Sequence, residues 1–506
     1  MTHTAPAVPR LLWFLGLAGA LTFLAAVGSP HEGVLTFRHI EAAVALAVLV
    51  HLMWNADPAW LLSAGLAASM FSGNWKLLGF GSTAVPDRLL LAAGLVAFLF
   101  RFPPARDRPR LTFRPVHAVL ALGVVYVAVS GFYGGGFKDR SGFFRLLDSY
   151  GLLPFVAFTV APVAFRTARQ RAILLGTLIA CGAYLGLTAL FEALKLHSLI
   201  WPHYISDPSV GIHQGRGRGP FLAGDANGMA LYACGVAALI GVLWCRQQGL
   251  RLRLQLLIGA IAVLDFSGVF FTLTRSVWLG SIIASVATLL VVRGLRRYLV
   301  PAAALGLAVV LGALAFIPGL ASESSQRGHD QRPIWDRENG NLTAVRMLEA
   351  KPLFGFGWNE FVPKSIDYYR QQPNFPMTSV GRPLHNALLA NVVELGVVGG
   401  VIWLAGLLMA WAGGIVRRGP PDIRPWQVGL VAIAVQWAIV SSFAPAAFAF
   451  PNLLLWMWAG VLWVEADPSD ARRGEHPELR RRAPLSRVAR RAALTAPGAG
   501  SRETPS

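Results

Sequence analysis

Four basic side chains stand beside long apolar segments and could act on a charged substrate. They are Arg216, Arg218, Arg275 and His385. Arginine binds phosphate oxygens through two parallel N–H groups, and the imidazole of histidine, with an ordinary pKa of about 6.5, can accept a proton from a hydroxyl. Together these residue types favour a reaction in which a hydroxyl attacks and a diphosphate leaves.

The arginines occupy two different settings. Arg216 and Arg218 lie in the glycine-rich stretch GRGRGPF (215–221), directly before an apolar segment. Glycines let backbone N–H groups approach an anion, and a helix N-terminus adds partial positive charge; a flexible loop with incidental arginines is the alternative. Arg275 lies between two apolar segments with almost no loop, so we expect it to face a protein-lined cavity. The alternative for Arg275 is a side chain that extends to the membrane surface.

His385 begins the stretch HNALLANVVELGVVGG (385–400), which follows a long polar segment. In a continuous helix, about 100° per residue would place Gly396 and Gly400 within about 60° of His385, and Glu394 on the opposite face. Gly396 and Gly400 would then form a small-residue face against which another helix packs closely. A purely structural histidine at a helix entrance is the alternative interpretation.

The composition predicts an all-α protein that crosses a membrane many times. The 506 residues are 55% hydrophobic and 14% charged, and the mean hydropathy is +0.52, whereas soluble proteins carry about 25% charged residues. The apolar segments predict about 12–14 transmembrane helices. They lie near residues 11–28, 39–54, 58–72, 88–101, 115–133, 151–166, 171–194, 224–244, 254–273, 276–292, 299–317, 386–413, 427–444 and 448–464.

Arginine-rich connections predict which side of the membrane each loop faces. They are 101–114, 166–171, 245–253, 293–297 and 417–424. Alternating the spans places all five on one side with both termini, and the positive-inside rule makes that side cytoplasmic, so the protein would lie in the cytoplasmic (inner) membrane. We expect the basic tail 466–506 to be disordered against anionic headgroups. This distribution of the +19 net charge disfavours a nucleic-acid partner.

The polar segment 318–384 is too long for a bare connection and would face the outside. Residues 341–352 have helical spacing, and Pro352 would end the helix. The predicted apolar side of this helix consists of Leu342, Val345, Met347 and Leu348. We therefore expect a small, partly helical cap over the outer surface of the membrane domain.

A substrate with a membrane-anchored diphosphate suits the outward arginines. A polyprenyl-diphosphate-linked sugar is such a substrate, because its diphosphate gains negative charge as it leaves and fixed cations stabilise that charge. The sequence has no DxD motif or acidic triad placed for a divalent ion on a nucleotide sugar. A lipid-linked donor is therefore favoured, and no metal or cofactor is expected.

Four motifs resemble those of the O-antigen ligase and O-antigen polymerase-like membrane proteins. His385 is followed by ten residues, Gly396, three residues and Gly400. The other motifs are LTRSVWLG (273–280), PLFGFG (352–357) and the GRGRGPF…NG segment (215–228), so the resemblance spans about residues 205–410. Thr274 stands where that family usually has serine.

This resemblance implies a C-type glycosyltransferase-like fold. It also implies metal-independent transfer of a glycan from undecaprenyl diphosphate to an acceptor hydroxyl at the outer face of the cytoplasmic membrane. Arg275, with Arg216 or Arg218, would hold the diphosphate, and His385 would activate the hydroxyl. The chain would comprise N-terminal helices (1–204), a ligase-like catalytic region (205–413), C-terminal helices (414–465) and the cytoplasmic tail (466–506).

Several alternatives stay open at this point. A ligase joins a finished chain to an acceptor and a polymerase joins repeat units to one another, and the acceptor itself is a glycan, lipid or protein of unknown identity. A lipid-linked-sugar flippase or transporter is the alternative from another class. It would need ionisable residues at the bilayer midplane, and Asp265 is the clear deep carboxylate among the later spans. A non-catalytic assembly protein is a further alternative.

Overall fold

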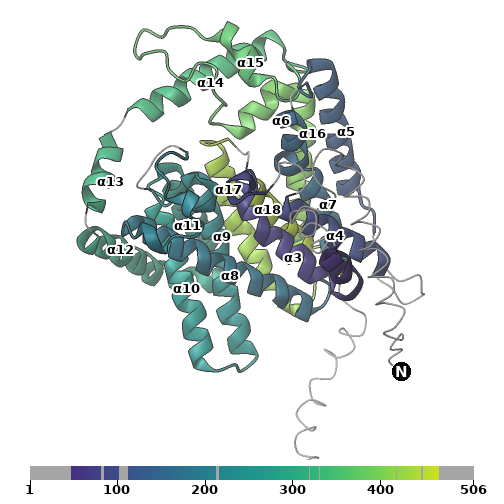
Figure 1. Cartoon of the computed structure of the whole chain (residues 1–506), viewed down its shortest axis with the longest axis vertical. Helices are drawn as coiled ribbons and strands as arrows, with labels where there is room; N and C mark the ends of the chain where they lie inside the picture. Colours follow the sequence, from purple (N-terminus) through teal and green to yellow (C-terminus); the bar gives the residue numbers. More distant parts are fainter. Residues whose placement is uncertain are drawn as a thin grey trace, which may run out of the picture.

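A computed structural model describes nine stretches of the chain, and within them the protein forms helices and no β-strand (Figure 1). The described residues are 47–80, 85–101, 112–138, 140–211, 216–317, 319–329, 331–417, 419–445 and 448–465. The predicted all-α class is confirmed. Helices suit a membrane because all their backbone hydrogen bonds are made within the segment.

The main apolar helices follow the predicted spans. They are α3 (Pro58–Ala68), α4 (Pro86–Arg101), α5 (Pro115–Gly134), α7 (Leu152–Ala164), α8 (Ala168–Ala193), α9 (Gly224–Gln247), α10 (Leu252–Phe271), α11 (Arg275–Val291), α12 (Leu299–Phe316), α16 (Ala387–Val416), α17 (Arg424–Ser441) and α18 (Ala449–Val461). Among the described residues, seven helical segments are long and apolar enough to cross a membrane, and three apolar segments are shorter. The chain is therefore a polytopic membrane protein. The predicted span 11–28 lies outside the described residues, as does the first half of 39–54.

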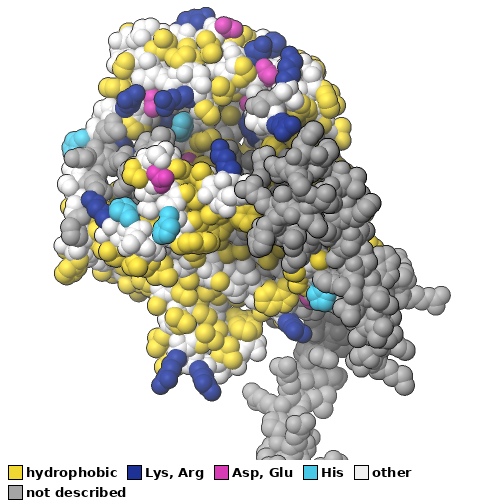
Figure 2. Space-filling model, viewed as in Figure 1, with side chains coloured by type: hydrophobic (Ala, Val, Ile, Leu, Met, Phe, Trp, Pro, Cys, Tyr) yellow, Lys and Arg dark blue, Asp and Glu magenta, His cyan; other side chains and the backbone are white. Residues whose placement is uncertain are grey.

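Helix α9 lies at the centre of the bundle and α12 at its edge (Figure 1). In α9, 72% of the apolar window is buried, against 6% for the segment Arg293–Phe316 that contains α12. Figure 2 shows a largely apolar surface below the top of the molecule, with charged side chains at the top and at the tip of the hairpin formed by α9 and α10. An apolar surface on a peripheral helix matches lipid contact.

Two ion pairs join arginine-rich connections at one end of the bundle. Arg171 binds Asp422 at 2.7 Å, and Arg114 binds Glu465 at 2.6 Å. Arg114 and Arg417 both lie over the Trp463 ring, so the connections around residues 114, 166–171 and 417–424 lie at the same end, as the alternation of spans predicts. At the other end of α8, Glu192 accepts hydrogen bonds from the N–H groups of Arg218 and Gly219, so the segment that carries Arg218 lies at the opposite end.

Residues 319–384, which we call the cap, contain the helices α13 (Leu320–His329), α14 (Arg332–Ala350) and α15 (Phe361–Ser365). Figure 1 shows α14 and α15 at the top of the bundle, over the end of α16. The expected helix at 341–352 is part of the longer α14, and of its expected apolar side Met347 and Leu348 pack inward whereas Leu342 and Val345 do not. Leu342 and Val345 are 40% and 44% exposed, whereas the buried face consists of Asn339, Gly340, Thr343, Ala344 and Met347.

Small residues make this buried face because α14 packs closely on the segment before α16. A Cβ atom at Gly340 would lie 2.9 Å from the Leu384 side chain. The hydrophobic core between the cap and α16 comprises Ala344, Met347, Phe356, Phe361, Leu384, Ala390 and Val393. The cap is therefore anchored directly beside His385.

Candidate functional site: a broken helix, a buried ion pair and a cationic cluster

Helix α16 begins after His385 and is broken at Gly396. Asn386 caps the helix by accepting a hydrogen bond from the Leu389 N–H, so His385 lies in the preceding loop. Gly396 has φ 69° and ψ 178°, a backbone conformation that is open to glycine and closed to most other residues. The expected continuous helix from 385 to 400 is therefore wrong.

The cap segment 352–357 (PLFGFG) fills the break and pairs with its free backbone groups. Phe356 and Gly357 donate to the carbonyls of Val393 and Glu394 at 3.2 and 2.9 Å, and Val397 and Val398 donate to those of Pro352 and Leu353 at 2.8 and 3.2 Å. The Tyr126 hydroxyl donates to the Leu395 carbonyl at 2.8 Å. Buried backbone groups in a membrane protein need such partners, so two of the motifs recognised in the sequence form one structural unit.

This break changes what the glycines do. A Cβ atom at Gly399 would lie 2.4 Å from the Tyr126 ring of α5, whereas at Gly400 the nearest group is the Val392 side chain of α16 itself. The predicted packing face of Gly396 and Gly400 is therefore wrong, because the turn at Gly396 removes the helical phase that would align them. Gly399 makes the close contact with the neighbouring helix.

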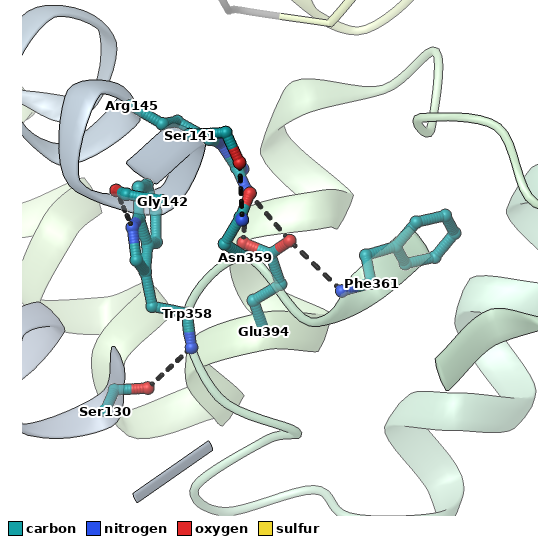
Figure 3. A network of polar contacts seen from close by, with 8 residues as sticks. All are labelled: Ser130, Ser141, Gly142, Arg145, Trp358, Asn359, Phe361 and Glu394. Carbon is teal, nitrogen blue, oxygen red and sulfur yellow. Dashed lines mark hydrogen bonds and ion pairs between the residues drawn. The ribbon is translucent and has the colours of Figure 1, made fainter. Parts of the chain in front are cut away.

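A buried ion pair joins two segments of the membrane domain next to the break, and cap residues contact it (Figure 3). Arg145, in the short π-helical segment Arg145–Tyr150, donates to both carboxylate oxygens of Glu394 at 2.9 and 2.8 Å. Glu394 also accepts from the Phe361 N–H at 3.3 Å. The Arg145 guanidinium lies 4.2 Å from the ring centroid of Trp358, and the Trp358 indole N–H donates to the Gly142 carbonyl at 2.9 Å.

Arg145→Ala is expected to destabilise the protein by about 3 kcal/mol, because it leaves the Glu394 carboxylate buried without its counter-ion. The check is the thermal unfolding midpoint in detergent, with exposed Arg140→Ala as the matched control. Arg145→Ala combined with Glu394→Gln should unfold at a higher temperature than Arg145→Ala alone, since the buried charge is gone. Equal midpoints for Arg145→Ala and Arg140→Ala would show that the pair does not stabilise the fold.

A cavity of about 650 Å³ lies beneath the cap between residues 135–150, which include α6 (Arg140–Phe144), and the helices α16, α17 and α18. Its polar lining includes Lys138, Arg145, Asn359, Glu360, Asn391 and Glu394, and its aromatic lining includes Tyr150, Trp358, Trp403, Trp437 and Trp456. Pro383, Leu384 and Ala387 also line it, so the cavity extends to the loop that carries His385. Glu394, expected on a separate face, lines this same cavity because the helix ends just beyond it.

His385 is half-buried, and its surroundings favour the neutral imidazole. Burial lowers the pKa of His385, and the positive charge of Arg337 lowers it further, while Asp336 and a backbone hydrogen bond with Pro383 act in the opposite direction. A ring nitrogen engaged with a carbonyl leaves the other nitrogen as an acceptor. A neutral histidine with one free acceptor nitrogen has the form that a general base requires.

Arg275 and Arg337 lie close enough for their charges to interact. Burial lowers the pKa of Arg337, and the charge of Arg275 adds to this effect, whereas Asp225 and Asp336 oppose it. Arginine nevertheless stays protonated in proteins. Arg337 also donates to the Phe443 carbonyl at 3.3 Å, so the cap, the start of α11 and the α17–α18 connection meet at this point. Arg337 thus lies near both Arg275 and the neutral His385, and the two arginines form a cationic cluster.

The two competing arginines of the glycine-rich segment have different roles in the structure. Arg218 is 1% exposed and donates to the carbonyls of Val210 and Ile205 at 3.2 and 2.7 Å. Arg216 is partly exposed, and its Nε atom is buried without a hydrogen-bond partner among the described residues. The intervening Gly217 N–H donates to the Phe271 carbonyl at 2.9 Å, which brings this segment beside the turn that precedes Arg275.

Three residues of the site were not predicted from the sequence: Arg337, Arg145 and Glu394. Each has a sequence feature that bears on its role. Arg337 was one of several charges in a polar loop, and only the packing of α14 brings it to His385. Arg145 and Glu394 each stand near or within an apolar run, and an ionisable residue in that setting usually has a partner. The sequence could have suggested that both are paired, but not that they pair with each other.

Comparison with known proteins identifies part of the chain. Residues 260–404 match the O-antigen ligase family. This stretch runs from α10 to α16 and contains Arg275, Arg337, His385 and Gly396. No curated protein and no solved structure matches the chain. The region 260–404 is therefore similar to O-antigen ligases of polysaccharide biosynthesis, and by its apolar helices the chain is a multi-pass membrane protein.

Proposed function

We propose that the protein transfers a glycan from a polyprenyl diphosphate, such as undecaprenyl diphosphate, to an acceptor hydroxyl, without a metal ion. The observation that carries this proposal is that Arg337 of the cap lies near both Arg275 and His385. A neutral base beside fixed guanidinium groups suits a reaction in which a hydroxyl loses a proton while a diphosphate gains charge. Arg216 is the third proposed diphosphate ligand, because it is partly exposed whereas Arg218 is buried and bound to loop carbonyls.

In the proposed reaction, a ring nitrogen of His385 accepts the proton of the acceptor hydroxyl as its oxygen forms a bond to the anomeric carbon. The bond between that carbon and the diphosphate oxygen breaks, and its electron pair stays on the diphosphate. Arg275 and Arg337 stabilise the negative charge that develops there, because their positions are set by packing before the reaction begins. The proton on His385 then passes to solvent.

The proposal includes an orientation. The ends joined by Arg171–Asp422 and Arg114–Glu465 would face the cytoplasm, because arginine-rich connections favour that side. The cap and His385 would then face the outside of the cytoplasmic membrane. Arg218, engaged with loop carbonyls, would position the segment that carries Arg216 rather than hold substrate. Ligase and polymerase forms of the reaction use this site equally.

Arg275→Ala and Arg337→Ala are each expected to lower the rate of transfer by about 10²-fold, the usual effect of removing one group that stabilises transition-state charge. The assay uses liposomes with purified protein, undecaprenyl-diphosphate-linked glycan and a panel of glycan and lipid-linked acceptors, with and without a chelator. Arg293→Ala, an exposed arginine between α11 and α12, is the matched control.

Two outcomes would contradict the proposal. Full transfer by Arg275→Ala or Arg337→Ala would remove that arginine from the site, and loss of transfer in the chelator would contradict a metal-independent reaction. A flippase or transporter would behave differently in the same liposomes. It would move labelled lipid-linked sugar across the bilayer and form no new glycosidic bond.

A further inference from the structure

The cavity beneath the cap is lined by four residues that are buried overall, and their polar groups are open to the cavity and make no hydrogen bond with another described residue. They are Tyr150, Asn391, Trp403 and Trp456, which are 6%, 6%, 8% and 3% exposed and all line the cavity. Other indoles in the same lining are paired: Trp358 donates to the Gly142 carbonyl and Trp437 to Asn452 Oδ1. Buried polar groups are normally paired, so a set of unpaired ones along one wall points to a ligand.

The chemistry of these groups distinguishes between possible ligands. One hydroxyl, one amide and two indole N–H groups would all gain partners from a molecule that carries several hydroxyls. A polyprenyl chain would leave every one of them unpaired, and an unpaired buried polar group is costly. The wall therefore favours a sugar over a lipid tail.

The charges along the cavity are balanced. Lys138 and Arg145 contribute two positive charges, and Glu360 and Glu394 contribute two negative charges. Arg145 and Glu394 are already paired with each other. A phosphate or carboxylate would find no excess positive charge here, in contrast to the cluster of Arg275 and Arg337. The balance favours an uncharged ligand.

The aromatic rings and the position of the cavity also favour a sugar ligand near His385. Tyr150 and Trp403 are stacked with ring centroids 6.4 Å apart, and pockets of this kind combine apolar faces with a few polar groups that fix orientation. The cavity reaches the loop of His385 through Pro383, Leu384 and Ala387, whereas Arg275 and Arg337 are not part of its lining. It therefore approaches His385 without including the proposed diphosphate ligands.

We propose that this cavity binds an uncharged sugar residue of the acceptor glycan and presents its hydroxyl to His385. Asn391, Tyr150 and the indole N–H groups of Trp403 and Trp456 bind the sugar hydroxyls. This inference rests on the proposed glycan transfer for the identity of the acceptor. Binding of a sugar in the cavity is testable separately from transfer.

The first experiment measures binding without turnover. Asn391→Cys in lipid nanodiscs is labelled with a maleimide; the native Cys181, Cys234 and Cys245 are buried, and the protein without the substitution measures their background. The probes are alkyl glycosides of neutral hexoses and N-acetylhexosamines, alkyl hexuronides, undecaprenyl diphosphate without sugar, and undecaprenyl-diphosphate-linked glycan. We expect the neutral glycosides to slow labelling at least fivefold and the other probes to have little effect.

Each other outcome overturns a defined part of the proposal. Protection by undecaprenyl diphosphate alone would make the cavity a lipid site, and equal protection by hexuronides would remove the selectivity for uncharged sugars. Protection by the lipid-linked glycan but not by the neutral glycosides would assign the cavity to the donor sugar. Absence of protection by every probe would overturn the sugar site itself.

The second experiment measures specificity during transfer. Tyr150→Phe removes the hydroxyl and keeps the ring, and Trp403→Phe replaces the indole by a smaller aromatic ring without the N–H. Each is expected to raise the KM for the acceptor about fivefold and leave the KM for the donor unchanged. Trp411→Phe is the matched control, because Trp411 lies on the same helix with an unpaired indole N–H and does not line the cavity. A rise in the donor KM alone would contradict the acceptor assignment. Protection in the first experiment with no transfer by the unsubstituted protein would refute the proposed function and leave the sugar site standing.

Discussion

His385→Ala is expected to lower the rate of glycan transfer by about 10²- to 10⁴-fold, the usual contribution of a positioned general base. The substitution removes the only group in the proposed site that is both neutral and able to accept the hydroxyl proton. The measurement is single-turnover transfer in liposomes, so that product release does not mask the chemical step. Folding should be little affected, because His385 lies in the loop before the Asn386 cap and is half-buried.

Protonation of His385 is also expected to set the acid limb of the pH profile of kcat/KM. The folded protein lowers the pKa of His385, mainly through burial and then through the charge of Arg337. The value of kcat/KM should therefore be full at neutral pH and fall as the pH drops through an apparent pKa below the ordinary value of about 6.5. Asp336→Asn removes a charge that raises this pKa, so the limb should move to lower pH. The nearby Arg382 also lowers it, so Arg382→Ala should move the limb to higher pH.

The control for His385→Ala is His329→Ala, which removes an exposed histidine from α13 in the cap. It should transfer glycan at the unsubstituted rate. If His385→Ala kept full activity, or if Asp336→Asn left the acid limb in place, His385 would not be the base. The arginine cluster would then act with a different proton acceptor.

Gly396→Ala is expected to destabilise the folded protein by about 3 kcal/mol or more, because it combines a strained backbone with a steric clash. At φ 69° an L-residue is disfavoured, and the new Cβ atom would lie 2.1 Å from the Leu353 carbonyl oxygen. The neighbouring segment cannot retreat cheaply, since Leu353 and Pro352 accept hydrogen bonds from Val398 and Val397. The check is the thermal unfolding midpoint of detergent-purified protein.

Gly312→Ala in α12 provides the comparison for this prediction. No atom lies within 4 Å of a Cβ built at Gly312, and alanine favours a helix over glycine by about 1 kcal/mol. Its unfolding midpoint should stay equal or rise. A similar midpoint for Gly396→Ala would mean that α16 is continuous in solution and that the PLFGFG segment does not occupy the break.

Much of the architecture was predictable because a membrane imposes simple rules on a sequence. Apolar segments of sufficient length must be helical, so the helices from α3 to α18 lie where hydropathy placed them. Arginine-rich connections such as 166–171 and 417–424 were expected together, and the Arg171–Asp422 pair joins them. The resemblance carried by Arg275, His385 and the PLFGFG motif agrees with the family match.

Predictions from helical periodicity were wrong where the chain departs from a regular helix. A helical wheel assumes a constant turn per residue, and the backbone reversal at Gly396 breaks that assumption. The reversal is stable because a segment about 40 residues earlier supplies the missing hydrogen bonds, and one-dimensional spacing contains no record of that contact. For the same reason the buried face of α14 follows Gly340 and Met347 rather than the larger Leu342 and Val345.

The sequence alone thus determined that the protein is an all-α membrane protein and which histidine and arginine could do chemistry. Only the tertiary structure decided that Arg337 from the cap joins Arg275 and His385, and that Arg145 pairs with Glu394 across 249 residues of chain. The sequence of a polar loop does not show which of its charged side chains become buried when the protein folds. Here the small-residue face of α14 packs beside the loop that holds His385, and this packing places the partly buried Arg337 near His385.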